Sequence, residues 1–199
     1  MVLGALENDS LLAMSIPAEG GRRRIGILVR IIENHIDGDG QLFIHVVAVS
    51  RLTVVNEWMA DGCVLARVLP LDDISIADEE AREVKETTAG QQEGILDQVT
   101  KEDLDRIPTA TLMHAAVELI NGLIEDPSSD WFNHEMVPVW GCPDDPVHFP
   151  WWFACILAGV NVTEKVRLLG STSVRERLKI CWEWLIDRRC GFILQRALE

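Results

Sequence analysis

Residues 24–49 read RIGILVRIIENHIDGDGQLFIHVVAV, two apolar runs joined by a short Asp-Gly stretch. The first run has apolar residues on both sides of an extended chain: Ile25, Ile27, Val29 and Ile31 on one side, Leu28 and Ile32 on the other. Such a pattern predicts a strand inside a barrel or between layers rather than a half-exposed one. Asp37-Gly38-Asp39-Gly40 supplies the positive-φ positions of a tight turn. The sequence therefore predicts an antiparallel hairpin here.

The strand pattern continues to residue 71. SRLTVV (residues 50–55) precedes a second turn signal, Asp61-Gly62, and CVLARVLPL (residues 63–71) follows it. Short strands joined by Asp-Gly turns within about 50 residues predict a small antiparallel barrel or sandwich.

After residue 72 the apolar residues recur at helical spacing. TATLMHAAVELINGLIED (Thr109 to Asp126) predicts one helix, WWFACILAG (Trp151 to Gly159) a buried one, and TEKVRLLG a short one with Thr163 as its cap. Ser173-x-x-Glu176 is a capping box that opens a last, long helix. Its expected inward stripe is Val174, Leu178, Cys181, Trp182 and Leu185. The fold class is α+β: an antiparallel β unit over 1–73, an acidic linker or partial helix over 74–108, and a helical unit over 109–199.

The charge of the chain excludes one class of partner. Its 199 residues carry 18 Lys and Arg against 32 Asp and Glu, a formal net charge of −14. Nucleic-acid binders usually present a basic stripe, so we expect no nucleic acid as partner. Residues 72–105 alone hold twelve acidic and three basic residues, which is typical of a solvated linker.

Composition and cysteine usage place the protein inside the cell. No apolar run reaches the length of about 18 residues that a membrane-spanning helix needs, so we expect no membrane association. No secretion signal is recognisable at the start. Five scattered cysteines do not form a disulfide framework, so we expect a reducing, cytoplasmic location.

The sequence offers little for catalysis. It lacks Gly-x-x-x-x-Gly-Lys-Ser/Thr, so it has no loop for nucleotide phosphates and no cofactor is expected. The best cluster of metal-binding residue types is His134, Cys142, Asp144, Asp145 and His148, but no pair has the close spacing of a zinc site. A hydrolase that uses Cys142 with His134 or His148 is a remote alternative. We expect no catalytic and no metal-binding residues.

Two tryptophans of the last helix are the candidates for partner binding. Trp182 and Trp184 are two residues apart, so a helix cannot direct both toward a core on one side. One of them is then exposed, and exposed aromatic side chains favour contact with partners.

Three segments, taken in order, resemble a known family. They are ALENDSLLAMSIP with IGILVRI (within residues 5–31), DGDGQLFIHVVAVSRLTVVNEW with DGCVLARVLPLDD (37–58 and 61–73), and PWWFACILAGVNVTEKVRLLGSTSVRERLKICWEWL (150–185). Together they resemble the Lon N-terminal domain, also called the Lon substrate-binding domain. The paired tryptophans and STSVRERL are most like the eukaryotic Lon-domain/RING-finger proteins.

The resemblance implies a PUA-like β barrel followed by a helical bundle, and a non-catalytic domain that binds protein clients or subunits of a degradation complex. The alternative that it leaves open is a substrate-recognition fragment of a larger ATP-dependent protease or RING-type ubiquitin ligase. This chain departs from the family at its start, because the first barrel strands have no counterpart. The barrel is therefore expected to be incomplete, with unpaired backbone groups at an edge.

Overall fold

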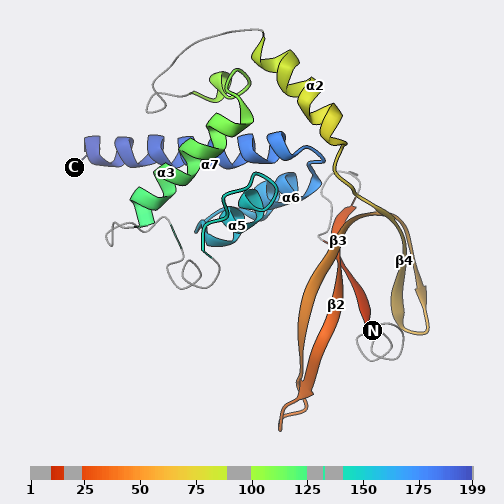
Figure 1. Ribbon diagram of the computed structural model, residues 1–199. Helices are drawn as coiled ribbons and strands as arrows, with labels where there is room; N and C mark the ends of the chain where they lie inside the picture. The colour runs from red at the N-terminus through yellow and green to blue at the C-terminus, as the bar shows by residue number, and fades with distance from the viewer. Residues whose placement is uncertain (1–9, 16–23, 89–99, 125–131, 133–140, 199) are drawn as a thin grey trace. The chain divides into compact units, whose positions relative to one another are not determined.

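The structure is a computed structural model that describes residues 10–15, 24–88, 100–124, 132 and 141–198. The chain divides into two compact units, Met1–Asp72 and Asp73–Glu199. The first unit contains the strands and the second contains the helices (Figure 1). The fold is therefore α+β, as the sequence predicts.

The first unit is a four-stranded antiparallel sheet in which each strand pairs with its neighbours in the sequence. Its strands are β1 (Leu11–Ser15), β2 (Arg24–Ile36), β3 (Leu42–Ala60) and β4 (Cys63–Pro70). Among the described residues β1 and β4 are the two edges, so the sheet is open. That the barrel is incomplete stays a prediction.

Both predicted turns form where the glycines allow them. Gly40 has φ +78° and its amide donates to Asp37 O, which closes the β2–β3 turn. In the β3–β4 turn Asp61 has φ +50° and Gly62 φ +74°. Two consecutive positive φ values match the right-handed twist of the flanking strands. The two apolar runs of residues 41–60 form one continuous strand, β3.

The expectation that β2 is buried on both sides is wrong. Within the sheet only Val29, Ile31 and Leu52 are buried large apolar side chains, and Ile32 is 57% exposed. The described part of this unit contains no second layer that could cover the sheet. An apolar strand therefore forms here without the burial that usually accompanies it.

The second unit is a helical bundle around one long helix. Its elements are α2 (Ile76–Thr87), the 3-10 turn η3 (Lys101–Asp103), α3 (Thr109–Ile124), α5 (Phe149–Ile156), α6 (Val162–Gly170) and α7 (Val174–Leu198). The helices predicted at 109–126, 151–159, 163–170 and from 173 are all present. Asp126 and Pro127, the predicted end of the first of them, lie outside the described residues.

Two helix starts differ in detail from the sequence prediction. Helix α6 is capped by Asn161, whose side chain accepts from the Glu164 amide at 2.9 Å, and not by Thr163. At α7 the predicted cap Ser173 does accept from the Glu176 amide, at 3.1 Å. The Ser173 amide, however, donates to the Ser171 hydroxyl, so Glu176 does not complete the expected capping box.

The core of the second unit lies against the first turns of α7. Leu178, Cys181, Trp182 and Leu185 of the predicted stripe are buried there, while Val174 is partly exposed. Residues Leu112, Ala116, Ile120, Phe149, Phe153, Ile156 and Leu168 from the surrounding helices complete the apolar cluster. None of the described helices has the length and apolar character needed to cross a membrane.

Gly26 should tolerate no side chain, because β1 passes close to it. A Cβ added at this position would lie 2.5 Å from Met14 O and 3.1 Å from Ser15 Cα. Gly26→Ala should therefore lower the free energy of unfolding by about 1–3 kcal/mol through overpacking. Gly38→Ala is the control, since nothing lies within 4 Å of a Cβ there. Urea unfolding of both variants measures the difference, and equal stabilities would contradict the close approach of β1 to β2.

Candidate functional site

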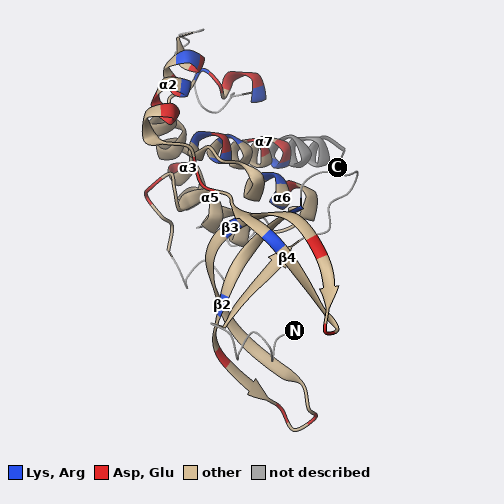
Figure 2. Cartoon of the chain, turned by 90° about the vertical axis from the view of Figure 1, so that its right-hand side faces the viewer, with Lys and Arg blue, Asp and Glu red and all other residues tan. Residues whose placement is uncertain are grey.

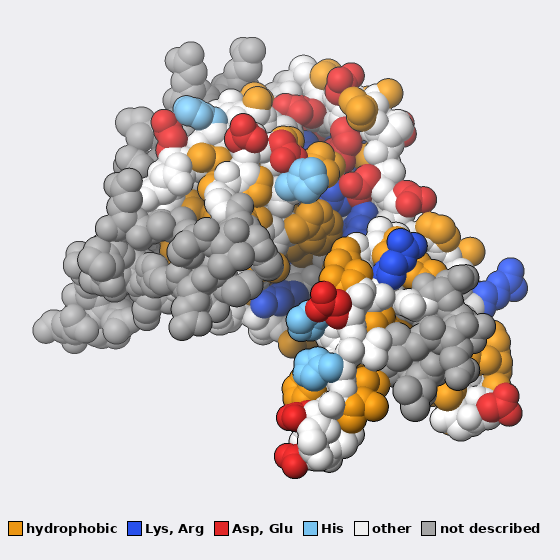
Figure 3. All heavy atoms as spheres, turned by 60° about the horizontal axis from the view of Figure 1, so that its bottom comes forward, with side chains coloured by type: hydrophobic (Ala, Val, Ile, Leu, Met, Phe, Trp, Pro, Cys, Tyr) orange, Lys and Arg blue, Asp and Glu red, His pale blue; other side chains and the backbone are white. Residues whose placement is uncertain are grey.

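The described sheet presents an unusual amount of apolar side chain to solvent. Eighteen large hydrophobic residues of the described chain are exposed, and thirteen of them lie on strands β1 to β4. We call these thirteen the apolar sheet surface: Met14, Ile32, Ile36, Phe43, Val46, Val47, Val49, Val55, Trp58, Met59, Val64, Leu65 and Leu69. Figure 3 shows hydrophobic side chains gathered over the strands on the face in view.

The apolar sheet surface is extensive in total but divided between the two faces of the sheet. Its side chains are between 37% and 67% exposed. With roughly 150 Å² for a large apolar side chain, the exposed area sums to about 1,000 Å² over both faces of the sheet. The largest apolar patch on a typical monomer covers about 300–600 Å². Averaged over the two faces the area is about 500 Å² on each, which falls within that range and below the roughly 800 Å² that a standard protein interface takes from each partner.

Cross-strand neighbours organise part of the apolar sheet surface. Trp58 on β3 lies directly opposite Leu65 on β4, and both are nearly half exposed. Near the other turn the rings of His35 and Phe43 stack with centroids 5.0 Å apart. Arg24 and Glu57 form an ion pair between β2 and β3. Aromatic and aliphatic side chains held in register on a rigid sheet can contact a partner without first becoming ordered.

The two tryptophans singled out in the sequence are both buried. Trp182 is 4% exposed and its ring nitrogen donates to Leu112 O at 3.0 Å. Trp184 is 6% exposed, donates to Glu164 Oε2 at 3.1 Å and stacks on Phe153. The expectation that one of them is exposed fails, because α7 is covered on two sides rather than one. A role for Trp182 or Trp184 in partner binding stays a prediction.

Cys142 and His148 do not make a nucleophile and base. The Cys142 thiol is nearest the backbone oxygen of Pro143, at 3.6 Å. Burial, with the Asp144 charge as a smaller cause, raises the pKa of Cys142, which favours the unreactive thiol. His148 instead pairs through Nδ1 with Asp145 at 2.9 Å. The remaining candidate, His134, lies outside the described residues.

No metal centre is found in the part of the chain that the structure describes. There, no three His, Cys, Asp or Glu side chains come together in a way that could hold an ion. Asp145 accepts hydrogen bonds from the amides of Val147 and His148, at 2.9 and 3.0 Å. Its carboxylate therefore stabilises the turn that leads into α5.

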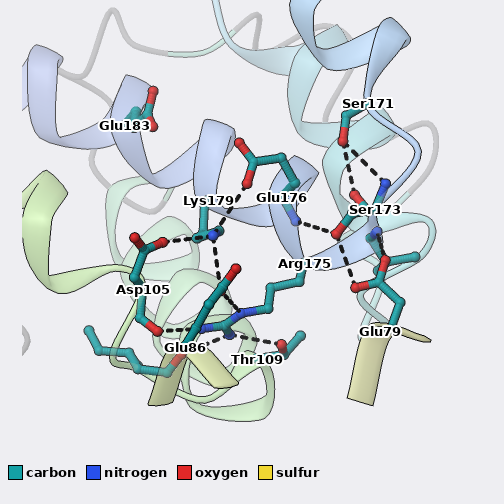
Figure 4. A network of polar contacts seen from close by, with 12 residues as sticks. Glu79, Glu86, Asp105, Thr109, Ser171, Ser173, Arg175, Glu176, Lys179 and Glu183 are labelled. Atoms are coloured by element: carbon teal, nitrogen blue, oxygen red, sulfur yellow. Dashed lines mark hydrogen bonds and ion pairs between the residues drawn. The ribbon is translucent and has the colours of Figure 1, made fainter. Parts of the chain in front are cut away.

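Sequence reasoning missed a network of buried cations on α7. Arg175, Arg177 and Lys179 are 1%, 0% and 6% exposed. The guanidinium of Arg177 makes two hydrogen bonds to Asp73, at 2.6 and 2.7 Å, and lies over the Trp151 ring at 4.9 Å. Arg175 and Lys179 both contact Glu86 of α2, as Figure 4 shows.

This network changes the interpretation of the acidic stretch. In Figure 2 the ribbon of α2 is marked by acidic residues and that of α7 by basic ones, and the two helices belong to the same unit. Glu79, Glu83 and Glu86 are partly buried and hydrogen-bonded to α7 or to the start of α3. These three carboxylates are therefore structural and not solvated. These glutamates recur every three or four residues, and this spacing is the feature of the sequence that indicates one shared face of a helix.

Comparison with known proteins gives one family and a fold. The family model described as the ATP-dependent protease La (LON) substrate-binding domain matches residues 7–187. The N-terminal domain of a Lon protease from the Mycobacterium avium complex has a similar structure, with a TM-score of 0.53 and 15% identity over 94% of this chain and 83% of that one. A Lon N-terminal domain protein from Xanthomonas campestris gives a TM-score of 0.49 and 16% identity over 92% and 80%. No curated protein matches the sequence.

Removing the carboxylate that faces Arg177 should destabilise the helical unit. In Asp73→Ala the fully buried guanidinium of Arg177 still donates a hydrogen bond to the Ser171 carbonyl, but it has lost the carboxylate that accepted two hydrogen bonds. Breaking a buried pair costs about 3–5 kcal/mol, and we expect about 3 because Asp73 is itself 33% exposed. Thermal unfolding measures the loss. The exposed neighbour Asp72 provides the control Asp72→Ala, and similar losses in the two variants would argue against the pair.

The turn before α5 should be sensitive to acid. Burial tends to raise the pKa of Asp145, but hydrogen bonds from His148 and Val147 outweigh it and hold the pKa below the ordinary 3.8. A lowered folded pKa means that the stabilisation is present above pH 3.8 and is lost as the pH falls through the folded value. The amide resonances of Val147 and His148 should therefore shift below pH 3.8. In Asp145→Asn, which keeps an acceptor that does not titrate, they should stay constant; a shift that persists would point to another group.

Proposed function

This chain belongs to the Lon substrate-binding domain family, and from that premise we propose that it binds other proteins through the apolar sheet surface. The family's domain is non-catalytic, which is consistent with the high pKa of the Cys142 thiol. The observation that carries the proposal is the concentration of exposed apolar side chains on the sheet, thirteen of eighteen in the described chain.

The ligand that fits this surface best is an extended polypeptide segment with apolar side chains. Such a segment can lay alternate side chains on the sheet and offer its backbone groups to an edge strand, here β1 or β4. Folded proteins have few apolar side chains and few backbone groups to spare for this. We therefore propose unfolded or partly unfolded proteins as the substrates.

The cellular setting of this binding is a further proposal. The family description names an ATP-dependent protease, so a client bound here is suited to delivery to a degradation machine. In the alternative setting, the same binding activity serves as the substrate-recognition part of a larger ATP-dependent protease or RING-type ubiquitin ligase. Both settings are in keeping with the cytoplasmic location expected from the cysteines. Co-purification with a protease or ligase subunit from cells of the source organism would distinguish an assembled arm from a free binding protein.

Removal of apolar side chains from the sheet should weaken binding to an unfolded protein. In Trp58→Ser/Leu65→Ser a pair of opposed, half-exposed side chains is lost. Burial is worth about 25 cal/mol per Å², so losing about 60 Å² of contact costs about 1.5 kcal/mol, slightly more than a factor of ten in Kd. Fluorescence anisotropy of a labelled, reduced and alkylated protein measures this Kd.

Two controls make the result specific. Val84→Ser/Leu119→Ser removes exposed apolar side chains from the helical unit and should leave the Kd unchanged. The same labelled protein in its native, folded form should bind at least tenfold more weakly to the unaltered chain. Equal Kd values for both double variants, or for folded and unfolded ligand, would refute the proposed surface or the proposed substrate.

A further inference from the structure

Helix α2 contacts the rest of its unit through charged side chains and turns its larger apolar side chains to solvent. Its carboxylates face inward, and its larger apolar residues, Ile76 and Val84, are 79% and 64% exposed. The helix has no buried residue at all. A surface helix normally packs an apolar stripe against the core. The described contacts of α2 with α3 and α7 are instead made by carboxylates four and three residues apart, at Glu79, Glu83 and Glu86.

Each of these carboxylates occupies a separate subsite. Glu79 accepts from the Ser173 hydroxyl at 3.0 Å and from the Val174 amide, at the start of α7. Glu83 accepts from the amide and hydroxyl of Thr109 at 2.9 and 2.8 Å, at the start of α3. The amino ends of two helices, where backbone amides are free and the dipole is positive, thus both receive an anion.

The third subsite is made of cations. Glu86 accepts from Arg175 Nε at 2.7 Å and from Lys179 Nζ at 3.1 Å. We call the Ser173, Thr109 and Arg175/Lys179 subsites together the carboxylate-docking site; Figure 4 shows Glu79 and Glu86 seated in two of them.

The carboxylate-docking site is held in place by groups that do not belong to α2. The Arg175 guanidinium also donates to the backbone oxygens of Ile107 and Asp105, at 2.9 and 2.8 Å. Lys179 is fixed by the carboxylates of Asp105 at 2.7 Å and Glu176 at 3.3 Å. Both cations therefore have partners besides α2. Because both cations are almost fully buried, leaving them without Glu86 is costly, and the site favours any occupant that supplies the same three carboxylates.

We propose that the carboxylate-docking site recognises acidic helices in general, and that α2 is its occupant in cis. A helix of a partner protein with glutamates at positions i, i+4 and i+7 takes the place of α2. The exchange is feasible because α2 contributes no buried side chain, so both helices are held by the same three contacts. Its bonds are charge-assisted, and because the Glu86 side chain is 23% exposed, salt weakens them.

The test uses the full chain and a peptide of residues 74–88, ISIADEEAREVKETT. In the variant Glu79→Gln/Glu83→Gln/Glu86→Gln the cis occupant has lost its charges. We expect the triple variant to bind two labelled peptides differently. Its Kd for the acidic peptide should be at least tenfold lower than its Kd for the same peptide with glutamine at 79, 83 and 86. The chain carrying Glu80→Gln, an exposed acid of the same helix, keeps α2 in place and should bind the peptide at least tenfold more weakly than the triple variant does.

A second measurement covers the case in which the triple variant is unstable. The acidic peptide should then raise its unfolding temperature, while the glutamine peptide should not. Binding or stabilisation that depends on the three carboxylates supports the docking site. A triple variant that neither binds nor is stabilised by the acidic peptide, or that responds equally to both peptides, overturns it. The substrate-binding proposal is unaffected by either result, because no residue of the sheet takes part.

Discussion

Helix α7 can be buried on nearly every side only because its cations meet carboxylates from distant parts of the chain. Arg175 and Arg177 are essentially without solvent contact, and an unpaired charge in that position would cost several kcal/mol. Their partners, Glu86 and Asp73, precede them by 89 and 104 residues. The stretch that begins at Asp73 therefore lies against α7 in the folded unit and neutralises its buried cations.

The two units meet the requirement for burial in different ways. In the helical unit, apolar side chains from α3, α5 and α7 form one cluster and the charges are paired around it. Among the described residues of the sheet unit, three large apolar side chains are buried and thirteen are exposed. A sheet with this much exposed apolar area gains free energy whenever another surface covers it. Among its described residues the helical unit exposes five large apolar side chains, so the same gain is smaller there.

The local features of this fold could be predicted from the sequence, because short-range physics determines them. The Asp-Gly pairs before Gln41 and Cys63 required positive φ, and the turns formed there. Helical spacing correctly located α3, α6 and α7. The cap of α6 was placed at Thr163 instead of Asn161, two residues away, because both residue types cap helices well. Pattern alone does not distinguish them.

The errors concern relations between distant segments. The argument that Trp182 and Trp184 cannot both be buried holds for a helix with one covered side, whereas α7 is covered around most of its circumference. The interpretation of residues 72–105 as solvated followed from their charge, and only pairing across more than 60 residues shows which of their carboxylates are enclosed. The same limit applies to β2, whose apolar pattern correctly indicated a strand. Whether such a strand is covered depends on what packs against it. The uncovered state of the described sheet is the reason why binding is proposed there and not on the helical bundle.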